Sequence, residues 1–265
     1  MKVLEKLIDQ FFGKGMAKWY VLLFMVYYSA ISLVNHYMFR TASLDLGVYT
    51  NAIYDYAHFR PNDCTLLPNQ NATLENVRLS NKWSDHFSIT QVLYTPFQFV
   101  FESYTLLLIQ ITSILFGGWG VYRFFVERFA NYSLATLAMV HFYWVFGIHS
   151  ALAFDYHDNV IGSMLVPWLF VFLTREKWWQ FSLLALAILG CKETMSILLI
   201  SIFGVLSIWP LVKTKKQRFA AASLAIASVC YFLIVTKWAM PTLADNNQTY
   251  SHFKYSALGN SYGEA

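Results

Sequence analysis

Four short segments carry side chains suited to binding a cation, exchanging a proton or meeting a phosphate. They are residues 43–49 (SLDLGVY), 84–87 (SDHF), 154–159 (FDYHDN) and 190–194 (GCKET). Each lies at the edge of a long apolar run, where a charged side chain is costly to desolvate unless it has a partner or a function. Carboxylate and imidazole groups in such places can hold a divalent cation or act as general acid or base.

The first two segments offer Asp45 and His86 as candidates. Asp45 follows the first apolar run, where it could be catalytic, bind a metal or simply cap a helix together with Ser43. His86 could be a ligand or a hydrogen-bonded structural residue. The adjacent Asp85 could be no more than a solvated helix cap. The residues alone leave both pairs of alternatives open.

The last two segments offer Asp155 with His157, and Lys192 with Glu193. The 154–159 turn has five hydrogen-bonding side chains in a row, without Lys, Arg or Gly, which is more than a solubilising turn requires. Lys192 and Glu193 stand inside about 30 apolar residues. They could form a structural ion pair or a short exposed turn, or Lys192 could meet a phosphate while Glu193 joins Asp45 and the 155–158 cluster around a cation.

Several other functions have no support in the sequence. No phosphate-binding glycine loop, zinc-protease motif or hydrolase elbow stands in a convincing context. The 3 cysteines form no CxxC pair, and no basic stripe is interleaved with stacking aromatics. Nucleotide hydrolysis, zinc proteolysis and nucleic-acid binding are therefore not expected.

The composition places these segments in a membrane protein. The chain is 57% hydrophobic and 18% aromatic but only 13% charged, about half the charged fraction of a soluble domain. We expect an all-α integral membrane protein in a lipid bilayer, with one polytopic domain over residues 1–265. The first apolar run is too long for a cleaved signal peptide and is predicted to be a retained anchor.

Apolar runs of suitable length predict about seven transmembrane helices. They cover residues 19–39, 104–122, 133–151, 160–174, 179–190, 194–212 and 219–238. The fourth and fifth are the shortest, so we expect any broken or re-entrant span there. Residues 40–103, called the first loop below, should form an outer loop with short juxtamembrane helices at the interface.

Basic residues predict the orientation of these spans. Most of the 19 Lys and Arg residues fall in the connections that alternate with the first loop: residues 1–18, 123–132, 175–178 and 213–218. The positive-inside rule then puts the N-terminus in the cytoplasm and the C-terminus outside. All four candidate segments fall on the outer side.

Four motifs in this order resemble an uncharacterised family of multi-pass, mostly prokaryotic membrane proteins, a resemblance that implies a prokaryotic plasma membrane. Residues 44–49 resemble its FDLGIY-like signature, with Leu44 in place of Phe. His86 with a downstream Tyr-Thr-Pro, residues 154–157 and Lys192-Glu193 follow, and the tail at residues 252–259 is also similar. Members generally continue further, which implies that this chain is truncated or that a partner chain supplies the missing C-terminal region.

That family is in turn similar to GT-C glycosyltransferases, polytopic enzymes with an essential acid in the first outer loop. The resemblance implies a membrane glycosyltransferase that uses a polyprenyl-phosphate-linked sugar donor on the outer face. Asp45 would be the general base or would anchor a divalent cation, and His86, Asp155, His157 and Glu193 would complete the pocket. Lys192 would hold the phosphate. Asp45, Asp155, His157 and Glu193 are also the implied metal ligands.

Two other functions remain open at this stage. A transporter or flippase of a lipid-linked or small polar substrate would use buried acids as coupling sites. A non-catalytic membrane assembly subunit would need no site at all. An enzyme predicts that the candidate residues converge on one outer cavity, whereas a transporter predicts a polar path through the bilayer midplane.

Overall fold

A computed structural model describes residues 2–68, 79–208 and 214–244. The tail at residues 252–259 lies outside the described residues. Helices begin within a few residues of each apolar run that the sequence predicts. They are α2 (Ala17–Tyr37), α6 (Thr105–Phe129), α7 (Tyr132–Tyr143), α8 (Phe146–Ala153), α9 (Asp158–Thr174), α10 (Trp178–Cys191), α11 (Met195–Ile208) and α12 (Lys215–Ile234).

Short elements fill the first loop and the two ends of the described chain. A helix, α1 (Lys2–Phe12), precedes α2, and a π-turn, η4 (Val235–Ala239), with α13 (Met240–Leu243) follows α12. The first loop holds η1 (Ser43–Gly47), α3 (Val48–Ala57), β1 (Asp63–Pro68), β2 (Leu79–Asn81), α4 (Lys82–Asp85), η2 (Ile89–Tyr94), α5 (Thr95–Phe101) and η3 (Glu102–Tyr104). Short helices were expected there, but the antiparallel pair β1–β2 was not.

Length separates the helices that can cross a bilayer from those that are shorter. Within the described residues, three helical stretches are long and apolar enough: Ala17–Tyr37, Ile89–Phe129 and Lys215–Leu243. The pair α7–α8, bent by 42°, makes a fourth if it counts as one span. Helices α9, α10 and α11 have 17, 14 and 14 residues. They reach only about 21–26 Å, against about 30 Å of hydrocarbon.

The break between α7 and α8 corrects one expectation. A broken span was expected among the fourth and fifth runs, but it falls in the third, where Trp144 and Val145 leave the helix. The Trp144 ring stacks on Tyr27 of α2 with ring centroids 5.9 Å apart. No Gly or Pro stands at the break to signal it, so the sequence gives little warning.

Polar caps explain where several helices begin. The side chain of Asn131 accepts a hydrogen bond from the backbone N–H of Leu134 at 2.9 Å, which starts α7. Thr214 and Gln217 form a reciprocal capping box at the start of α12. Such caps satisfy backbone donors that have no partner inside the helix.

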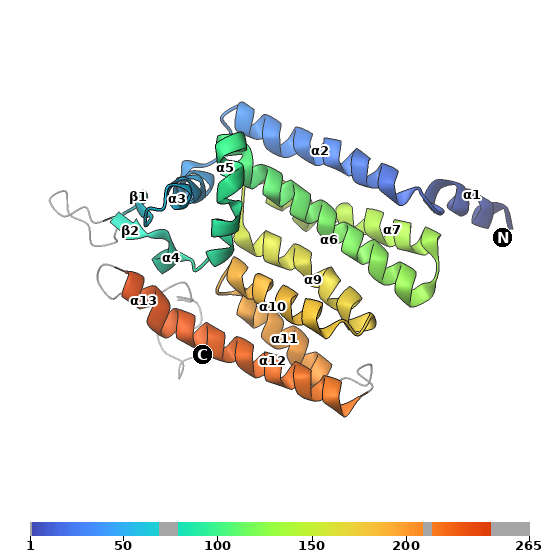
Figure 1. The fold of residues 1–265 in the computed structure, drawn as a ribbon. Coiled ribbons are helices and arrows are strands. Elements are labelled where there is room, and N and C mark those ends of the chain that lie inside the picture. The colour runs from blue at the N-terminus through green and yellow to red at the C-terminus, as the bar shows by residue number, and fades with distance from the viewer. Residues whose placement is uncertain (1, 69–78, 209–213, 245–265) are drawn as a thin grey trace, which may run out of the picture.

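The helices pack side by side in the order α2, α6 with α7, α9, α10 with α11, and α12 (Figure 1). One buried cluster joins α2, α6, α7 and α8, and contains Phe24, Tyr28 and Met139. A second joins α3, α6, α9, α10 and α11, and contains Tyr156 and Phe203. The short helices α9, α10 and α11 are thus sheltered by the longer ones.

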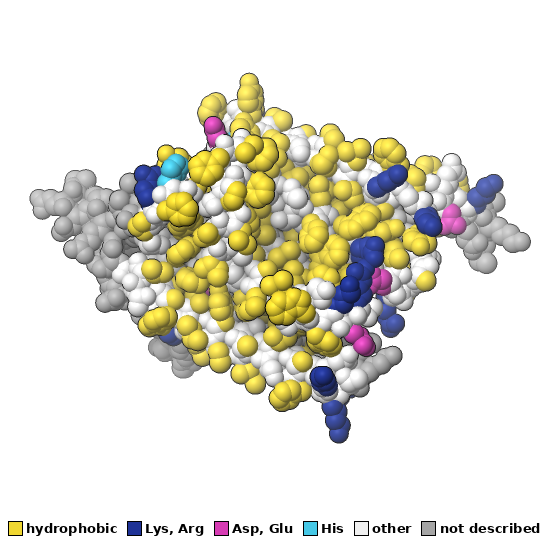
Figure 2. Space-filling view, in the orientation of Figure 1, with side chains coloured by type: hydrophobic (Ala, Val, Ile, Leu, Met, Phe, Trp, Pro, Cys, Tyr) yellow, Lys and Arg dark blue, Asp and Glu magenta, His cyan; other side chains and the backbone are white. Residues whose placement is uncertain are grey.

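The two ends of the bundle differ in charge. The first loop and the connections at residues 154–157 and 192–194 lie together at one end, which we call the site end (Figure 1). Lys and Arg side chains gather at the opposite end, where α1 and the α6–α7 connection lie (Figure 2). All four candidate segments therefore lie at the site end.

A close approach between α6 and α7 depends on Gly118. A Cβ atom at this position would overlap the ring of Tyr143. The Tyr143 hydroxyl donates to the carbonyl of Leu115 at 2.7 Å, and Tyr28 donates to the backbone carbonyl of Tyr143 at 2.6 Å. The backbone of Tyr143 is thus held by α2, and its ring cannot move away from Gly118 without breaking the hydrogen bond to Leu115.

Gly118→Ala is therefore expected to lower the melting temperature of the purified protein, at a cost of about 1–3 kcal/mol for overpacking. Gly204→Ala on α11 is the matched control, because no heavy atom lies within 4 Å of the added Cβ. That variant should be neutral or more stable by up to about 1 kcal/mol. Equal melting temperatures for the two variants would contradict the packing described here.

Candidate functional site

Four side chains with a formal charge are buried in the described part of the chain, and all lie at the site end. Glu193 is 0% exposed, Lys82 and Asp158 are each 1% exposed, and Asp155 is 6% exposed. Burial of an ionised group costs several kcal/mol unless hydrogen bonds or an opposite charge compensate for it. The partners of each group therefore reveal its role.

Asp158 at the start of α9 is fully engaged by neutral donors. Its carboxylate accepts hydrogen bonds from Ser88 Oγ at 2.7 Å, Gln91 Nε2 at 3.0 Å and Tyr156 Oη at 2.6 Å. Ser88 and Gln91 belong to the first loop, so Asp158 ties that loop to α9. A carboxylate with three donors is suited to holding structure together.

Glu193, between α10 and α11, anchors the same loop at a second point. Its Oε2 accepts a hydrogen bond from the backbone N–H of Phe87 at 3.0 Å, and its Oε1 lies 3.1 Å from His86 Nδ1. Burial lowers the pKa of His86, although the hydrogen bond to Glu193 opposes this and the charge of Lys82 adds to it. A neutral imidazole that donates from Nδ1 fits this environment.

Lys82 is buried beside both an acid and an aromatic ring. Its Nζ lies 3.0 Å from Asp85 Oδ2 and 4.4 Å from the ring centroid of Tyr49. The ion pair and the cation–π contact together compensate for the burial of the ammonium group. This contact joins α4 to α3 within the first loop.

Asp155 sits in a strained turn that Gln110 of α6 clamps. The residue has φ 82°, in the left-handed region. Gln110 Nε2 donates to the Asp155 carbonyl at 2.5 Å, and Gln110 Oε1 accepts from the His157 N–H at 2.9 Å. The Asp155 carboxylate accepts from the backbone N–H of Ala42 at 2.6 Å. Strain of this kind persists only where the surroundings impose it.

Asp155 belongs to a group of four ionisable side chains around His157. Burial raises the pKa of Asp155, and the charge of Asp45 raises it further, while the Ala42 N–H and the charge of His157 lower it. Burial lowers the pKa of His157, and the charge of Lys192 lowers it further, while the charges of Asp45 and Asp155 raise it. Asp45, Asp155 and Lys192 thus all act on His157, and we call these four residues the charge group.

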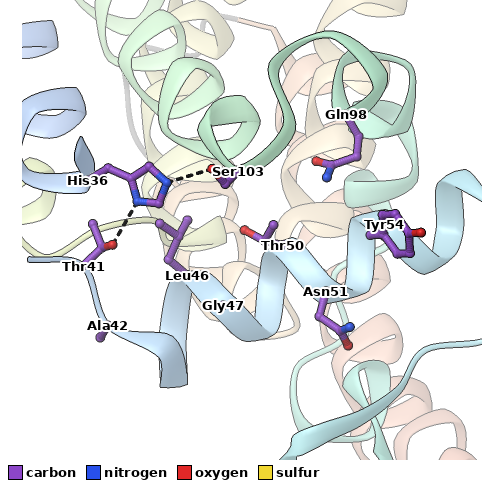
Figure 3. Close-up of a pocket in the computed structure, with 10 residues that line it drawn as sticks. All are labelled: His36, Thr41, Ala42, Leu46, Gly47, Thr50, Asn51, Tyr54, Gln98 and Ser103. Atoms are coloured by element: carbon purple, nitrogen blue, oxygen red, sulfur yellow. Dashed lines mark hydrogen bonds between the residues drawn. The ribbon is translucent and has the colours of Figure 1, made fainter. Parts of the chain in front are cut away.

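A cavity of about 490 Å³ lies next to the charge group. Its walls come from the end of α2, from η1 and α3, and from α5 and η3 (Figure 3). The lining residues are His36, Thr41, Ala42, Leu46, Gly47, Thr50, Asn51, Tyr54, Gln98 and Ser103. Ala42 is the residue that Asp155 holds, and Leu46 directly follows Asp45. None of the six predicted site residues is part of this lining.

A second hollow of about 770 Å³ adjoins the cavity and shares His36, Thr41 and Ser103 with it. Tyr37, Met38, Phe39 and Tyr104 form the rest of its wall. The shared His36 ring has Nδ1 2.9 Å from Thr41 Oγ1 and Nε2 2.9 Å from Ser103 Oγ. Both hollows thus have mostly apolar walls with a few polar side chains, and they meet at the end of α2.

The structure brings the predicted site residues together as two sets. His86 and Glu193 bond each other, and the other four make up the charge group. The predicted cation ligands Asp45, Asp155, His157 and Glu193 are not gathered: in the described residues, no group of three or more His, Cys, Asp or Glu is placed to hold a metal ion. One reason is that the Glu193 carboxylate is already bound by the first loop.

Lys82, His36 and Gln98 are not among the residues that the sequence singles out, and Asp158 is predicted only as a member of the 154–159 turn and its possible cation cluster. Lys82 resembles any cation of a polar loop. His36 and Gln98 lie in apolar stretches, where a polar side chain is itself a signal for a buried partner or a ligand.

Comparison with known proteins gives one match. The model of a family described as "Predicted membrane protein (DUF2079)" matches residues 35–265. No curated protein and no solved structure matches. The matched region includes all four candidate segments and both hollows.

The buried state of His86 predicts how stability depends on pH. Its unfolded pKa is about 6.5, and burial lowers the folded pKa. Below about pH 6.5 the unfolded chain binds the proton more tightly, so stability is lost as the pH falls. His86→Gln keeps a donor for Glu193 without this titration. The free energy of unfolding of this variant should fall less steeply than that of wild type between pH 7.5 and 5.5, and the two slopes should differ by at most about 1.4 kcal/mol per pH unit. Melting temperatures measured across this range report the difference.

His58→Gln is the matched control for this experiment, because His58 is an exposed histidine at the same end. It should retain the wild-type slope. If His86→Gln and wild type have parallel profiles over this range, His86 is not held neutral by the fold.

Proposed function

The chain belongs to this family of membrane proteins, and we propose that it is a polytopic, GT-C-like glycosyltransferase that uses a polyprenyl-phosphate-linked sugar donor. As an integral membrane protein it lies in a lipid bilayer. The proposal joins the resemblance of its four motifs to the charge and cavity geometry at the site end. It treats the site end as the place where the lipid-linked donor and the acceptor meet.

The proposed topology has seven crossings with the N-terminus in the cytoplasm. Helices α9, α10 and α11 are short, but they pack among α6 and α12, and such shelter lets a shorter helix cross a bilayer. Basic side chains gather at the opposite end from the site (Figure 2). By the positive-inside rule, that end faces the cytoplasm and the site end faces out.

The observation that carries the proposal is the charge group beside two adjoining hollows. The second hollow, at the end of α2, has exposed aromatic walls, with Tyr37 71% and Phe39 95% exposed, and it suits a polyprenyl chain that enters from lipid. The first cavity has several hydroxyl and carboxamide side chains among its lining residues, and these suit a sugar. The charge group lies beside this cavity through Asp155 and Ala42.

Glycosyl transfer assigns a role to each member of the charge group. The bond between the anomeric carbon and the phosphate oxygen breaks, and a bond from that carbon to an acceptor oxygen forms. Asp45 takes the acceptor proton as general base. Lys192 neutralises the phosphate that leaves with the bonding electrons. Asp155 and His157 set the local field and position Asp45.

A transport function has weaker support. Coupling residues of a transporter are expected near the bilayer midplane. In the described part of the chain, the buried formal charges are Lys82, Asp155, Asp158 and Glu193, all at one end. Their positions favour chemistry at a surface over passage through the bundle.

Asp45→Asn should lower the rate of glycosyl transfer by about 10²-fold or more, because the general base is lost. The assay measures transfer of label from radiolabelled polyprenyl-phosphate sugars to acceptor in proteoliposomes. Asp9→Asn is the control, since Asp9 bonds Ser133 at the opposite end. It should keep wild-type activity. Transfer that survives in Asp45→Asn would remove Asp45 from the mechanism, and a folded wild type that transfers no label from any donor would refute the proposed function.

Lys192→Gln should lower kcat for the same transfer by about 10²–10³-fold, because the charge on the leaving phosphate is no longer balanced. Lys192→Arg should restore part of the loss, because the positive charge returns. The comparison is made at saturating donor. If the glutamine variant changes KM alone, Lys192 binds the ground state without favouring the transition state.

A further inference from the structure

We propose that the cavity between α2, α3 and α5 is a binding site for a neutral, hydroxyl-rich ligand, the sugar ring of a glycoside. The inference deepens the proposed function and rests on it for the statement that this sugar is a substrate. The binding site itself is argued from the cavity walls alone.

The cavity has the size of a ligand site and the side chains of a sugar site. Its volume of about 490 Å³ falls in the range of about 300–1,000 Å³ typical of small-molecule pockets. Hydroxyl groups of Thr41, Thr50 and Ser103 line it, together with the carboxamide of Gln98 (Figure 3). Asn51 is also a lining residue, but its carboxamide points away from these groups and accepts a hydrogen bond from Asn62. Hydroxyls and carboxamides both donate and accept, as the hydroxyls of a sugar require.

Two of these side chains lack the partners that buried polar groups normally have. Thr50 Oγ1 and Gln98 Oε1 are buried without a hydrogen-bond partner among the described residues. Gln98 is only 8% exposed and lies on an otherwise apolar helix, α5. An unpaired buried polar group costs about 1–3 kcal/mol. Both atoms are turned away from open space, so a rotation of either side chain toward a polyol in the cavity is what would pair it and remove this cost.

The cavity lining has no formally charged side chain, which favours an uncharged ligand. No Asp, Glu, Lys or Arg is among the ten lining residues, and both ring nitrogens of His36 already contact Thr41 and Ser103. A phosphate or carboxylate in the cavity would have no counter-charge in contact. The charges stand outside the wall instead, with Asp155 held against the backbone of Ala42. The cavity thus receives the uncharged ring, and the charge group receives the reacting end.

The test measures binding of free glycosides without any donor or turnover. Full-length protein is placed in phosphatidylcholine nanodiscs, because alkyl-glycoside detergents would compete. Saturation-transfer NMR then gives the Kd of methyl β-D-glucoside and methyl α-D-mannoside, with methyl β-D-glucuronide as the charged comparator. The cavity variants are Thr50→Val and Gln98→Leu, and the matched controls are Thr112→Val and Gln180→Leu, at exposed positions away from the cavity. Melting temperatures confirm that each variant is folded.

At least one neutral glycoside should bind wild type, and each cavity variant should weaken it about three- to tenfold through loss of a hydrogen bond. The controls should bind as wild type does, and the glucuronide should bind at least about tenfold more weakly, because its charge has no partner. Failure of both neutral glycosides to bind folded wild type, equal Kd values in cavity and control variants, or equal binding of the glucuronide would each overturn the inference.

A second arm identifies the source of the sugar. Nanodiscs that contain monoglucosyl diacylglycerol are compared with nanodiscs of phosphatidylcholine alone. Displacement of methyl glucoside by the glycolipid identifies a lipid headgroup as ligand, and retention identifies a free sugar; both support a neutral sugar site. Glycoside binding without label transfer would overturn the proposed function only. Label transfer together with unchanged Kd values in the cavity variants would overturn this inference only.

Discussion

Carboxylates buried in an apolar bundle need hydrogen-bond donors, and this need determines how the first loop lies on the helices. Asp158, at the start of α9, and Glu193, between α10 and α11, are both buried away from water. Their donors come largely from the first loop: Ser88 and Gln91 for Asp158, and His86 with the backbone of Phe87 for Glu193. Removal of either acid would leave these donors unpaired. The first loop is thus fixed to the helices at two points, Asp158 and Glu193.

This anchoring separates two kinds of acid at the site end. Asp158 and Glu193 are bound by several donors each and act as structural anchors. The Asp155 carboxylate accepts a hydrogen bond from the backbone N–H of Ala42, and the residue has a positive φ and a pKa raised chiefly by burial. Natural proteins concentrate strain and perturbed ionisation at functional sites and compensate for them elsewhere. Gln110 and Asp158 supply that compensation here, because Gln110 clamps the turn in which Asp155 is strained and Asp158 fixes its end to the first loop.

Much of the helix arrangement could be predicted from the sequence, because runs of apolar residues between charged boundaries leave few alternatives in a bilayer. The details that could not be predicted depend on tertiary contacts. Trp144 breaks a helix without Gly or Pro, and Gly118 is required only because Tyr143 packs on it. Asp155 and Asp158 lie in one turn of the sequence, yet one faces the charge group and the other faces Gln91. No pattern of residue types distinguishes them before the loop is folded against α9.

The same reasoning explains why the cavity escaped sequence analysis while the charges beside it did not. Charged residues in apolar runs are conspicuous, because their desolvation cost demands an explanation. Thr50, Gln98 and Ser103 are neutral and come from three separate elements, so only the folded chain brings them together. The anchored first loop forms most of this wall, and α2 supplies His36. The structural acids thus fix the loop that forms this uncharged cavity, and Asp155 stands just outside the cavity wall with its carboxylate on the backbone of Ala42.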